Sequence, residues 1–149
     1  MNRPTIVLAE DHSNVAEQLR KLLADSFDVV AVVGHGEALV KTALRLKPDV
    51  VVTDISMPGM DGLRAAHELR LHQPSLAVVF VTVHDDRALA RKALSTGHGY
   101  VLKASAGEEL VDAVNAVLDG RPFVSASLGS VESLVERAPR PSARDAPSR

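Results

Sequence analysis

Hydrophobic residues follow two alternating spacings along this chain. Short, nearly continuous apolar runs, rich in β-branched residues, occupy residues 5–9, 29–33, 50–53, 77–82 and 99–102. Runs of this length that are apolar on both faces are typical of strands buried in a parallel sheet. The sequence therefore predicts five parallel β-strands.

After each run, apolar residues recur every three or four positions, as they do on one face of an amphipathic helix. The first stripe is Val15, Leu19, Leu22 and Leu23, and the last is Leu110, Ala113, Val114 and Val117. A helix after each strand fits a parallel sheet, because parallel neighbours need a crossover connection. We expect an α/β domain of five strands and five helices.

Several residues mark where the predicted helices begin and end. Pro48 and Pro74 stop helices ahead of the third and fourth strands, because proline cannot continue a helix. Ser105 and Glu108 have the spacing of a capping box that opens the fifth helix. Asp61, just before a glycine, is typical of a helix cap. These signals divide the chain at the same places as the hydrophobic pattern.

The chain changes character after Gly120. Residues 121–149 hold four of the eight prolines and six serines, a composition that cannot build a core. We expect one domain over residues 3–120, followed by a linker-like, largely disordered tail over 121–149, with a short helix around 128–135. A length of 149 residues suits one hydrophobic core and is too short for two ordinary domains.

Composition narrows the classes of function. A net charge of -2 and 3% aromatic residues argue against nucleic-acid contact by this chain itself. The chain has no cysteine, which excludes disulfides and thiolate catalysis. Its longest apolar stretch, residues 76–83, is too short for a membrane helix, and Met1 to Pro4 lead straight into a strand and not into a signal peptide. We expect a cytoplasmic protein without membrane contact.

Polar residues stand where four of the predicted strands end. Glu10 and Asp11 follow the first strand, Asp54 follows the third, Thr82 ends the fourth and Lys103 follows the fifth. In a parallel sheet these ends share one edge, where open α/β folds bind their ligands. The sequence thus predicts one pocket containing three carboxylates, a hydroxyl and an ammonium group.

These residue types suit phosphoryl chemistry. Three carboxylates match Mg²⁺, a hard cation that prefers oxygen ligands and neutralises charge on a phosphoryl group. Asp54 can act as a nucleophile through a carboxylate oxygen and form an acyl phosphate. Lys103 and Thr82 offer a mobile positive charge and a hydroxyl donor to phosphoryl oxygens.

The set resembles the receiver domain of two-component response regulators, over about residues 3 to 120. Four segments carry the resemblance: VLAEDH at 7–12, PDVVVTDISMPGMDG at 48–62, VTVHDD at 81–86 and GYVLK at 99–103. The residues in these segments are most similar to those of the subgroup that usually carries a LuxR-type helix-turn-helix output domain. We expect no such output domain within residues 121–149, so that the sequence is either a stand-alone receiver or a shortened one.

The resemblance implies a flavodoxin-like, doubly wound sheet with strand order 2-1-3-4-5. It also implies transfer of a phosphoryl group from a sensor histidine kinase to Asp54. Magnesium would be held by Glu10, Asp11, Asp54 and the backbone carbonyl of Ser56. Thr82 and Lys103 would bind the phosphoryl group, and Tyr100 would turn from exposed to buried as Thr82 shifts.

The switched surface that the resemblance implies is made by the fourth helix, fifth strand and fifth helix. It would serve as a homodimer contact and control signalling, with transcription as the output.

Two other functions remain open. A stand-alone receiver could act as a phosphoryl shuttle or as a protein-binding module that takes no phosphoryl group. A phosphatase with an aspartyl nucleophile usually has a second aspartate two residues after the first, where this chain has Ser56. Phosphorylation with a small acyl phosphate separates these functions.

Overall fold

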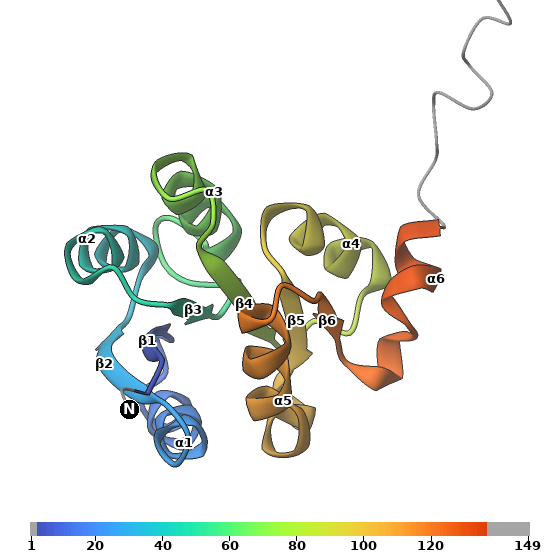
Figure 1. The fold of residues 1–149 in the computed structure, drawn as a ribbon, viewed down its shortest axis with the longest axis horizontal. Coiled ribbons are helices and arrows are strands. Elements are labelled where there is room, and N and C mark those ends of the chain that lie inside the picture. The colour runs from blue at the N-terminus through green and yellow to red at the C-terminus, as the bar shows by residue number, and fades with distance from the viewer. Residues whose placement is uncertain (1–2, 137–149) are drawn as a thin grey trace, which may run out of the picture.

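In this computed structural model, which describes residues 3–136, six parallel strands form one sheet in the order β2-β1-β3-β4-β5-β6 (Figure 1). The strands are β1 (Thr5–Ala9), β2 (Asp28–Val33), β3 (Val50–Thr53), β4 (Ala77–Thr82), β5 (Gly99–Leu102) and β6 (Phe123–Val124). The predicted α/β class and the order of the first five strands are confirmed. The prediction of a five-stranded sheet is wrong, because β6 adds a sixth strand beside β5.

Helices cover both faces of the sheet (Figure 1). They are α1 (Ser13–Ala24), α2 (Gly36–Leu46), α3 (Gly62–His72), α4 (Arg87–Thr96), α5 (Ala106–Leu118) and α6 (Val131–Glu136), with short 3-10 turns η1 (Lys103–Ser105) and η2 (Ala126–Leu128). The helices α1 and α5 bury one face, and α2, α3 and α4 bury the other. The sixth helix lies beside α4.

Two hydrophobic cores result from this arrangement, one on each side of the sheet. On the α1 and α5 side, Ile6, Leu8 and Leu110 are fully buried. On the other side, Val7 and Phe80 are fully buried. In β1, β3, β4 and β5, alternate residues enter opposite cores, which is why these strands read as continuous apolar runs. The edge strand β2 instead leaves Val30 and Val32 exposed.

The segment after α5 is part of the fold as far as residue 136. Leu128 and Leu134 are buried in the same core as α4. Arg87 and Arg91 of α4 donate hydrogen bonds to the backbone carbonyls of Leu128 and Leu134, the second at 3.0 Å. The short helix predicted around 128–135 is present as α6, which begins three residues later, at Val131, and ends at Glu136. The rest of the predicted tail, 137–149, lies outside the described residues.

The predicted helix caps have mixed outcomes. Asp61 accepts a 2.8 Å hydrogen bond from the backbone N–H of Arg64 and caps α3, as expected. The capping box at Ser105 is wrong, because the Ser105 side chain makes no capping hydrogen bond. The 3-10 turn η1 occupies Lys103–Ser105 and leads directly into α5, so the helix needs no separate cap there.

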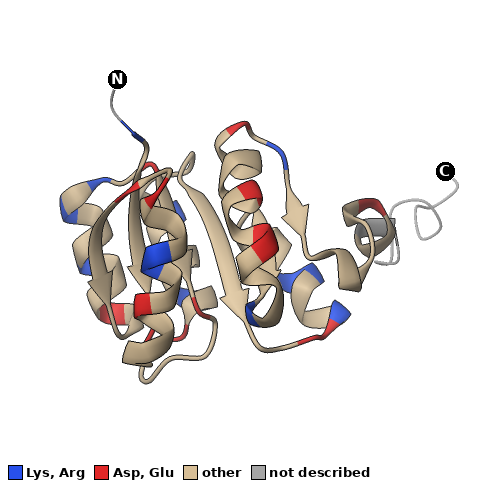
Figure 2. Ribbon diagram, turned by 90° about the horizontal axis from the view of Figure 1, so that it is seen from below, with Lys and Arg blue, Asp and Glu red and all other residues tan. Residues whose placement is uncertain are grey.

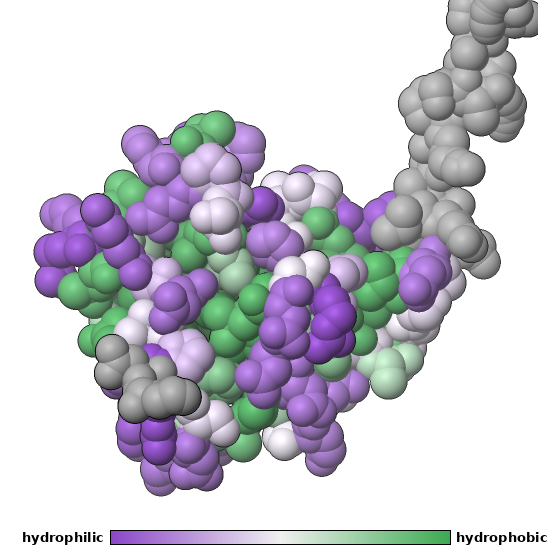
Figure 3. Space-filling model, viewed as in Figure 1, coloured by the Kyte–Doolittle hydropathy of each residue, from purple (hydrophilic) through white to green (hydrophobic). Residues whose placement is uncertain are grey.

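Charged and hydrophobic residues are mixed over the surface of the domain. Figure 2 shows acidic and basic residues interspersed over the helices. On the face drawn in Figure 3, hydrophilic side chains separate the hydrophobic patches. None of the helices within residues 3–136 is long and apolar enough to cross a membrane.

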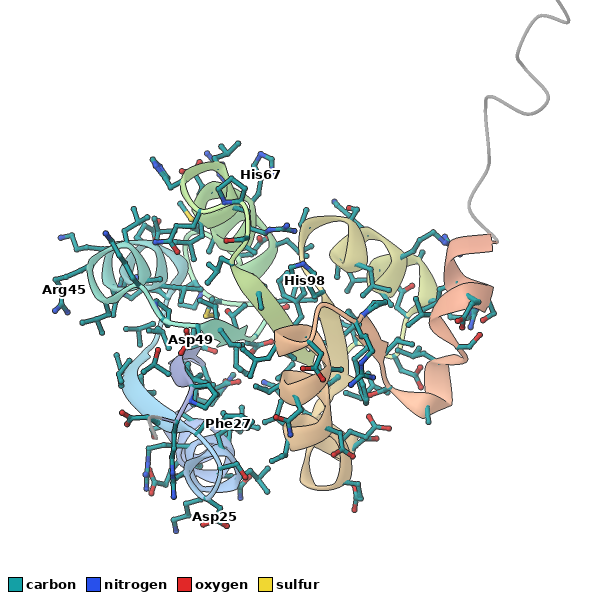
Figure 4. All side chains as sticks on the ribbon, viewed as in Figure 1. Asp25, Phe27, Arg45, Asp49, His67 and His98 are labelled. Carbon is teal, nitrogen blue, oxygen red and sulfur yellow. The ribbon has the colours of Figure 1, made fainter. Side chains whose placement is uncertain are left out.

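The two edges of the sheet carry different residues. Phe27, Asp49 and His98 directly precede β2, β3 and β5 and therefore mark the amino edge (Figure 4). There Asp49 accepts hydrogen bonds from the backbone N–H and the hydroxyl of Thr5, at 2.8 and 3.2 Å. The residues of the predicted pocket follow the strands and lie at the opposite, carboxyl edge.

Candidate functional site

The strand register brings the acids of the first and third strands together. Ala9 pairs with Thr53 in neighbouring strands, and the N–H of Asp54 donates a 2.9 Å hydrogen bond to the Ala9 carbonyl. Glu10 and Asp54 therefore leave the sheet side by side. Their residues are only 3% and 5% exposed. Two carboxylates at this depth need a nearby positive charge.

Lys103 provides that charge. Its ammonium Nζ lies 2.8 Å from Glu10 Oε1 and donates a 3.0 Å hydrogen bond to Asp54 Oδ2. The sequence placed these three residues on three strand ends, and the structure brings them into direct contact. One cation is thus shared by two buried acids, which leaves the cluster with an excess of negative charge.

The environment shifts the pKa of each member of this cluster. Burial raises the pKa of the Asp54 carboxyl, and the contact with Lys103 offsets this only in part. Burial alone would also raise the pKa of Glu10, but Lys103 and the N–H and ring of His12 outweigh it and lower that pKa. Burial by itself would lower the pKa of Lys103, yet its contacts with Glu10 and Asp54 raise it. Lys103 therefore stays an ammonium at neutral pH.

Asp11 and His12 extend the site toward solvent. Glu10 Oε2 accepts a 3.1 Å hydrogen bond from the backbone N–H of His12. The ring Nδ1 of His12 lies 3.0 Å from Glu10 Oε2 and 3.3 Å from Asp11 Oδ1. His12 is not among the residues that the sequence predicts for the pocket. Its position directly after the two acids was the available signal.

The acidic group fits a hard divalent cation. Ligand atoms of Glu10, Asp11 and His12 lie within 4.8 Å of one another. Within residues 3–136, Glu10 Oε1 receives no aligned hydrogen bond despite its burial, so a lone pair is free for a further positive charge. Oxygen donors with surplus negative charge are the ligands that Mg²⁺ prefers.

Ser56 and His84 join two loops across the site. The N–H of Ser56 donates a 3.3 Å hydrogen bond to Asp54 Oδ1. The Ser56 hydroxyl Oγ lies 3.0 Å from Nε2 of His84, which follows β4. Each oxygen of the Asp54 carboxylate therefore has a donor, Ser56 on one and Lys103 on the other. This fixes the direction in which the carboxylate points.

Thr82 and Tyr100 are both buried beside this loop. Thr82 ends β4 opposite Leu102 of β5, and its hydroxyl oxygen accepts a 3.2 Å hydrogen bond from the N–H of His84. The Tyr100 hydroxyl donates a 2.7 Å hydrogen bond to the backbone carbonyl of His84. Burial, with Asp86 and Asp85 nearby, raises the pKa of Tyr100 to about 12. Tyr100 is thus neutral and inward-facing in this structure.

Gly62 supports Asp54 from behind, a role that sequence reasoning missed. A Cβ atom on Gly62 would lie 1.9 Å from the Asp54 carbonyl oxygen. The N–H of Gly62 also donates a 2.7 Å hydrogen bond to the carbonyl of Ile55. The loop after β3 can close on α3 only because residue 62 has no side chain.

A parallel sheet of this strand order, with an acid cluster and a lysine at its carboxyl edge, fits a receiver domain. The family model of the response regulator receiver domain matches residues 6–115, and the chain belongs to this family. Within it, the chain is similar to the LuxR-type subgroup of response regulators, as its motifs predicted.

Relatives and solved structures agree with this assignment. Response regulator GacA of Pseudomonas aeruginosa is 33% identical over 95% of this chain and 67% of its own length. A LuxR-family response regulator from Aurantimonas superposes with a TM-score of 0.83 at 30% identity, over 91% of this chain and 98% of that one. The receiver domain of RcsB from Salmonella enterica, solved with the phosphomimetic BeF3-, superposes with a TM-score of 0.78 at 29% identity, over 89% of this chain and 99% of that one. The chain spans about half to two thirds of the length of the curated relatives that it matches.

Proposed function

We propose that this receiver accepts a phosphoryl group on Asp54 from a sensor histidine kinase, with Mg²⁺ as cofactor. The observation that carries the proposal is the position of the Lys103 ammonium, in contact with both Glu10 and Asp54. The lysine is largely buried and points at the carboxylate that would be modified.

In the transfer step, a carboxylate oxygen of Asp54 forms a bond to phosphorus as the bond from phosphorus to the histidine nitrogen of the kinase breaks. When bound by Glu10, Asp11, Asp54 and the Ser56 carbonyl, Mg²⁺ would neutralise charge on the phosphoryl oxygens. Lys103 and Ser56 N–H hold Asp54 in one orientation before transfer. Afterwards Lys103 and the Thr82 hydroxyl would bind the new phosphoryl oxygens.

The proposed switch connects the site with the surface formed by α4, β5 and α5. Thr82 and Tyr100 bind opposite backbone groups of His84, so a shift of Thr82 toward a phosphoryl group would move the residue that Tyr100 holds. The modification would bias this surface between two states and so control a homodimer contact. Control of transcription through an output domain is the proposed downstream effect.

A mass measurement tests the proposal. The chain is incubated with acetyl phosphate and Mg²⁺, and the product is examined for one added phosphoryl group that base removes. We expect the adduct in wild type and in Asp85→Asn, which changes an exposed acid in the next loop, and no adduct in Asp54→Asn. Failure of the wild type to form an adduct would favour the binding module. Rapid turnover of many phosphate esters would favour the phosphatase.

A further inference from the structure

We propose that Ser125, held by Glu109, is a positioning residue for Lys103, so that the segment after α5 forms part of the acceptor site. The inference rests on the proposed function of Asp54. Ser125 lies outside the match to the family model, which ends at residue 115, whereas Glu109 and Lys103 lie inside it. Ser125 contacts neither Asp54 nor Lys103 in the described hydrogen bonds and would act through the backbone of β5.

Ser125 prolongs the contact between β6 and β5 beyond the strand pair itself. The register pairs Gly99 with Phe123 and Tyr100 with Val124, and the N–H of Ser125 donates a 2.9 Å hydrogen bond to the Tyr100 carbonyl. The Ser125 hydroxyl then accepts a 2.8 Å hydrogen bond from the N–H of Leu102. A side chain thus takes the place that the next backbone carbonyl would hold in a longer strand.

Glu109 of α5 fixes the direction of this hydrogen bond. Its Oε1 lies 2.5 Å from the Ser125 hydroxyl, and its Oε2 accepts a 3.1 Å hydrogen bond from the N–H of Ala126. An ionised carboxylate only accepts, so the Ser125 proton must point to Glu109. The Ser125 lone pairs are then free for the Leu102 N–H. Ser125 is fully buried, which strengthens both bonds.

The pair formed by Ser125 and Glu109, here called the clamp, acts at the residue that precedes Lys103. Leu102 is the last residue of β5, and it is held by β4 through its pairing with Thr82 and by Ser125 from the other side. The lysine side chain has four rotatable bonds, so its reach to Glu10 and Asp54 depends on where its backbone is fixed. Misplacement by about 1 Å can cost about 100-fold in rate.

The test is the rate constant of phosphorylation by acetyl phosphate with Mg²⁺. In Ser125→Ala we expect the rate to fall by at least about tenfold, since the Leu102 N–H loses its acceptor. The matched control is Ser127→Ala in the same segment, where the serine is exposed, and its rate should equal that of wild type. An unchanged rate in Ser125→Ala would overturn the inference.

A double-mutant cycle separates positioning from general loss of structure. If Ser125 acts through Lys103, Ser125→Ala will have no further effect on the rate in a Lys103→Ala background, although it will still lower thermal stability. Equal slowing in both backgrounds would show a merely structural role and overturn the inference. Adduct formation in wild type is measured alongside, so that failure of the proposed function is seen separately.

A second pair of variants covers the case in which Ser125→Ala does not fold. Glu109→Gln keeps the size of the side chain but removes its charge and turns one acceptor into a donor. We expect slower phosphorylation in Glu109→Gln and wild-type rates in Glu108→Gln, its exposed neighbour on α5. Folding is checked by circular dichroism. A wild-type rate in folded Glu109→Gln would reject the clamp.

Discussion

The Tyr100 hydroxyl donates a 2.7 Å hydrogen bond to the backbone carbonyl of His84. Tyr100 is fully buried, and Thr82 binds the N–H of the same His84. The loop after β4 is therefore held at His84 from two directions: by Thr82, which is proposed to bind the phosphoryl group, and by Tyr100, the proposed switch residue.

Tyr100→Phe removes the first of these bonds and should lower the free energy of unfolding by about 1 kcal/mol at neutral pH. The pKa of Tyr100, raised to about 12 by burial, lies above that of an unfolded tyrosine, near 10. Its contribution is therefore complete below about pH 10 and is lost as pH rises toward about 12. Denaturant unfolding of both proteins measures this. A difference that grew with alkalinity would contradict the assignment.

Lys103→Ala should still accept a phosphoryl group, at a reduced rate, but should fail to switch. The lysine neutralises the site during transfer and is the group expected to bind the phosphoryl afterwards. The measurement is the oligomeric state before and after acetyl phosphate treatment, by size-exclusion chromatography with light scattering. Lys41→Ala, an exposed lysine on α2, is the control. A wild-type shift in the Lys103 variant would refute the prediction.

Asp54→Asn should raise the melting temperature in the absence of divalent cations. Because burial raises the pKa of Asp54, its ionised form costs stability above that pKa, and the amide removes the cost. Added Mg²⁺ should raise the melting temperature of wild type by mass action and that of the variant much less. Calorimetry checks both. Equal responses to Mg²⁺ would mean that Asp54 is not a ligand.

Gly62→Ala should destabilise the protein by about 3 kcal/mol or more. The new Cβ would lie 1.9 Å from the Asp54 carbonyl oxygen. Relieving this clash requires a shift of the backbone at residue 62 or at Asp54, and either shift would move the Asp54 carboxylate. Gly107→Ala is the control, since a Cβ there meets nothing within 4 Å in the first turn of α5. That change should be neutral or stabilising by up to about 1 kcal/mol. Similar unfolding curves for the two variants would count against the close approach.

Shortening the chain should affect stability at one place and not at another. Ending it after Gly120 removes Ser125, Leu128 and Leu134, which are buried, and should cost several kcal/mol at roughly 2 kcal/mol for each leucine. Ending it after Arg137 should leave the melting temperature unchanged, because the residues beyond include three prolines and no large apolar side chain. A drop of several degrees in the second variant would contradict this.

The strands β1, β3, β4 and β5 could be predicted closely because each is a continuous apolar run that enters both cores. The edge strand β2 was predicted from its run of valines, although Val30 and Val32 are exposed. The sixth strand could not be predicted, since Phe123 and Val124 form only two residues of strand between Pro122 and a serine-rich stretch. Their pairing depends on the distant partner β5. The capping box at Ser105 failed for a related reason, because the chain leaves β5 through a 3-10 turn that local spacing does not reveal.

The acid and lysine positions were predictable from topology, since parallel strands must share an edge. The contacts between loops could not be predicted in this way. Ser56 meets His84 and Ser125 meets Glu109 across separations of 28 and 16 residues. Such pairs depend on side-chain orientation in the loops that join strands and helices, where neither hydrophobic period nor strand ends constrain the choice.

The clamp at Ser125 has a practical consequence for how this protein is divided. An expression boundary drawn at residue 115, where the family match ends, would keep every acid of the pocket but remove the last turn of α5 and Ser125, the residue proposed to anchor the backbone before Lys103. A phosphorylation rate measured on such a fragment would be that of a pocket with a misplaced lysine. Rates of isolated receiver domains should therefore be compared only between fragments that end at equivalent residues.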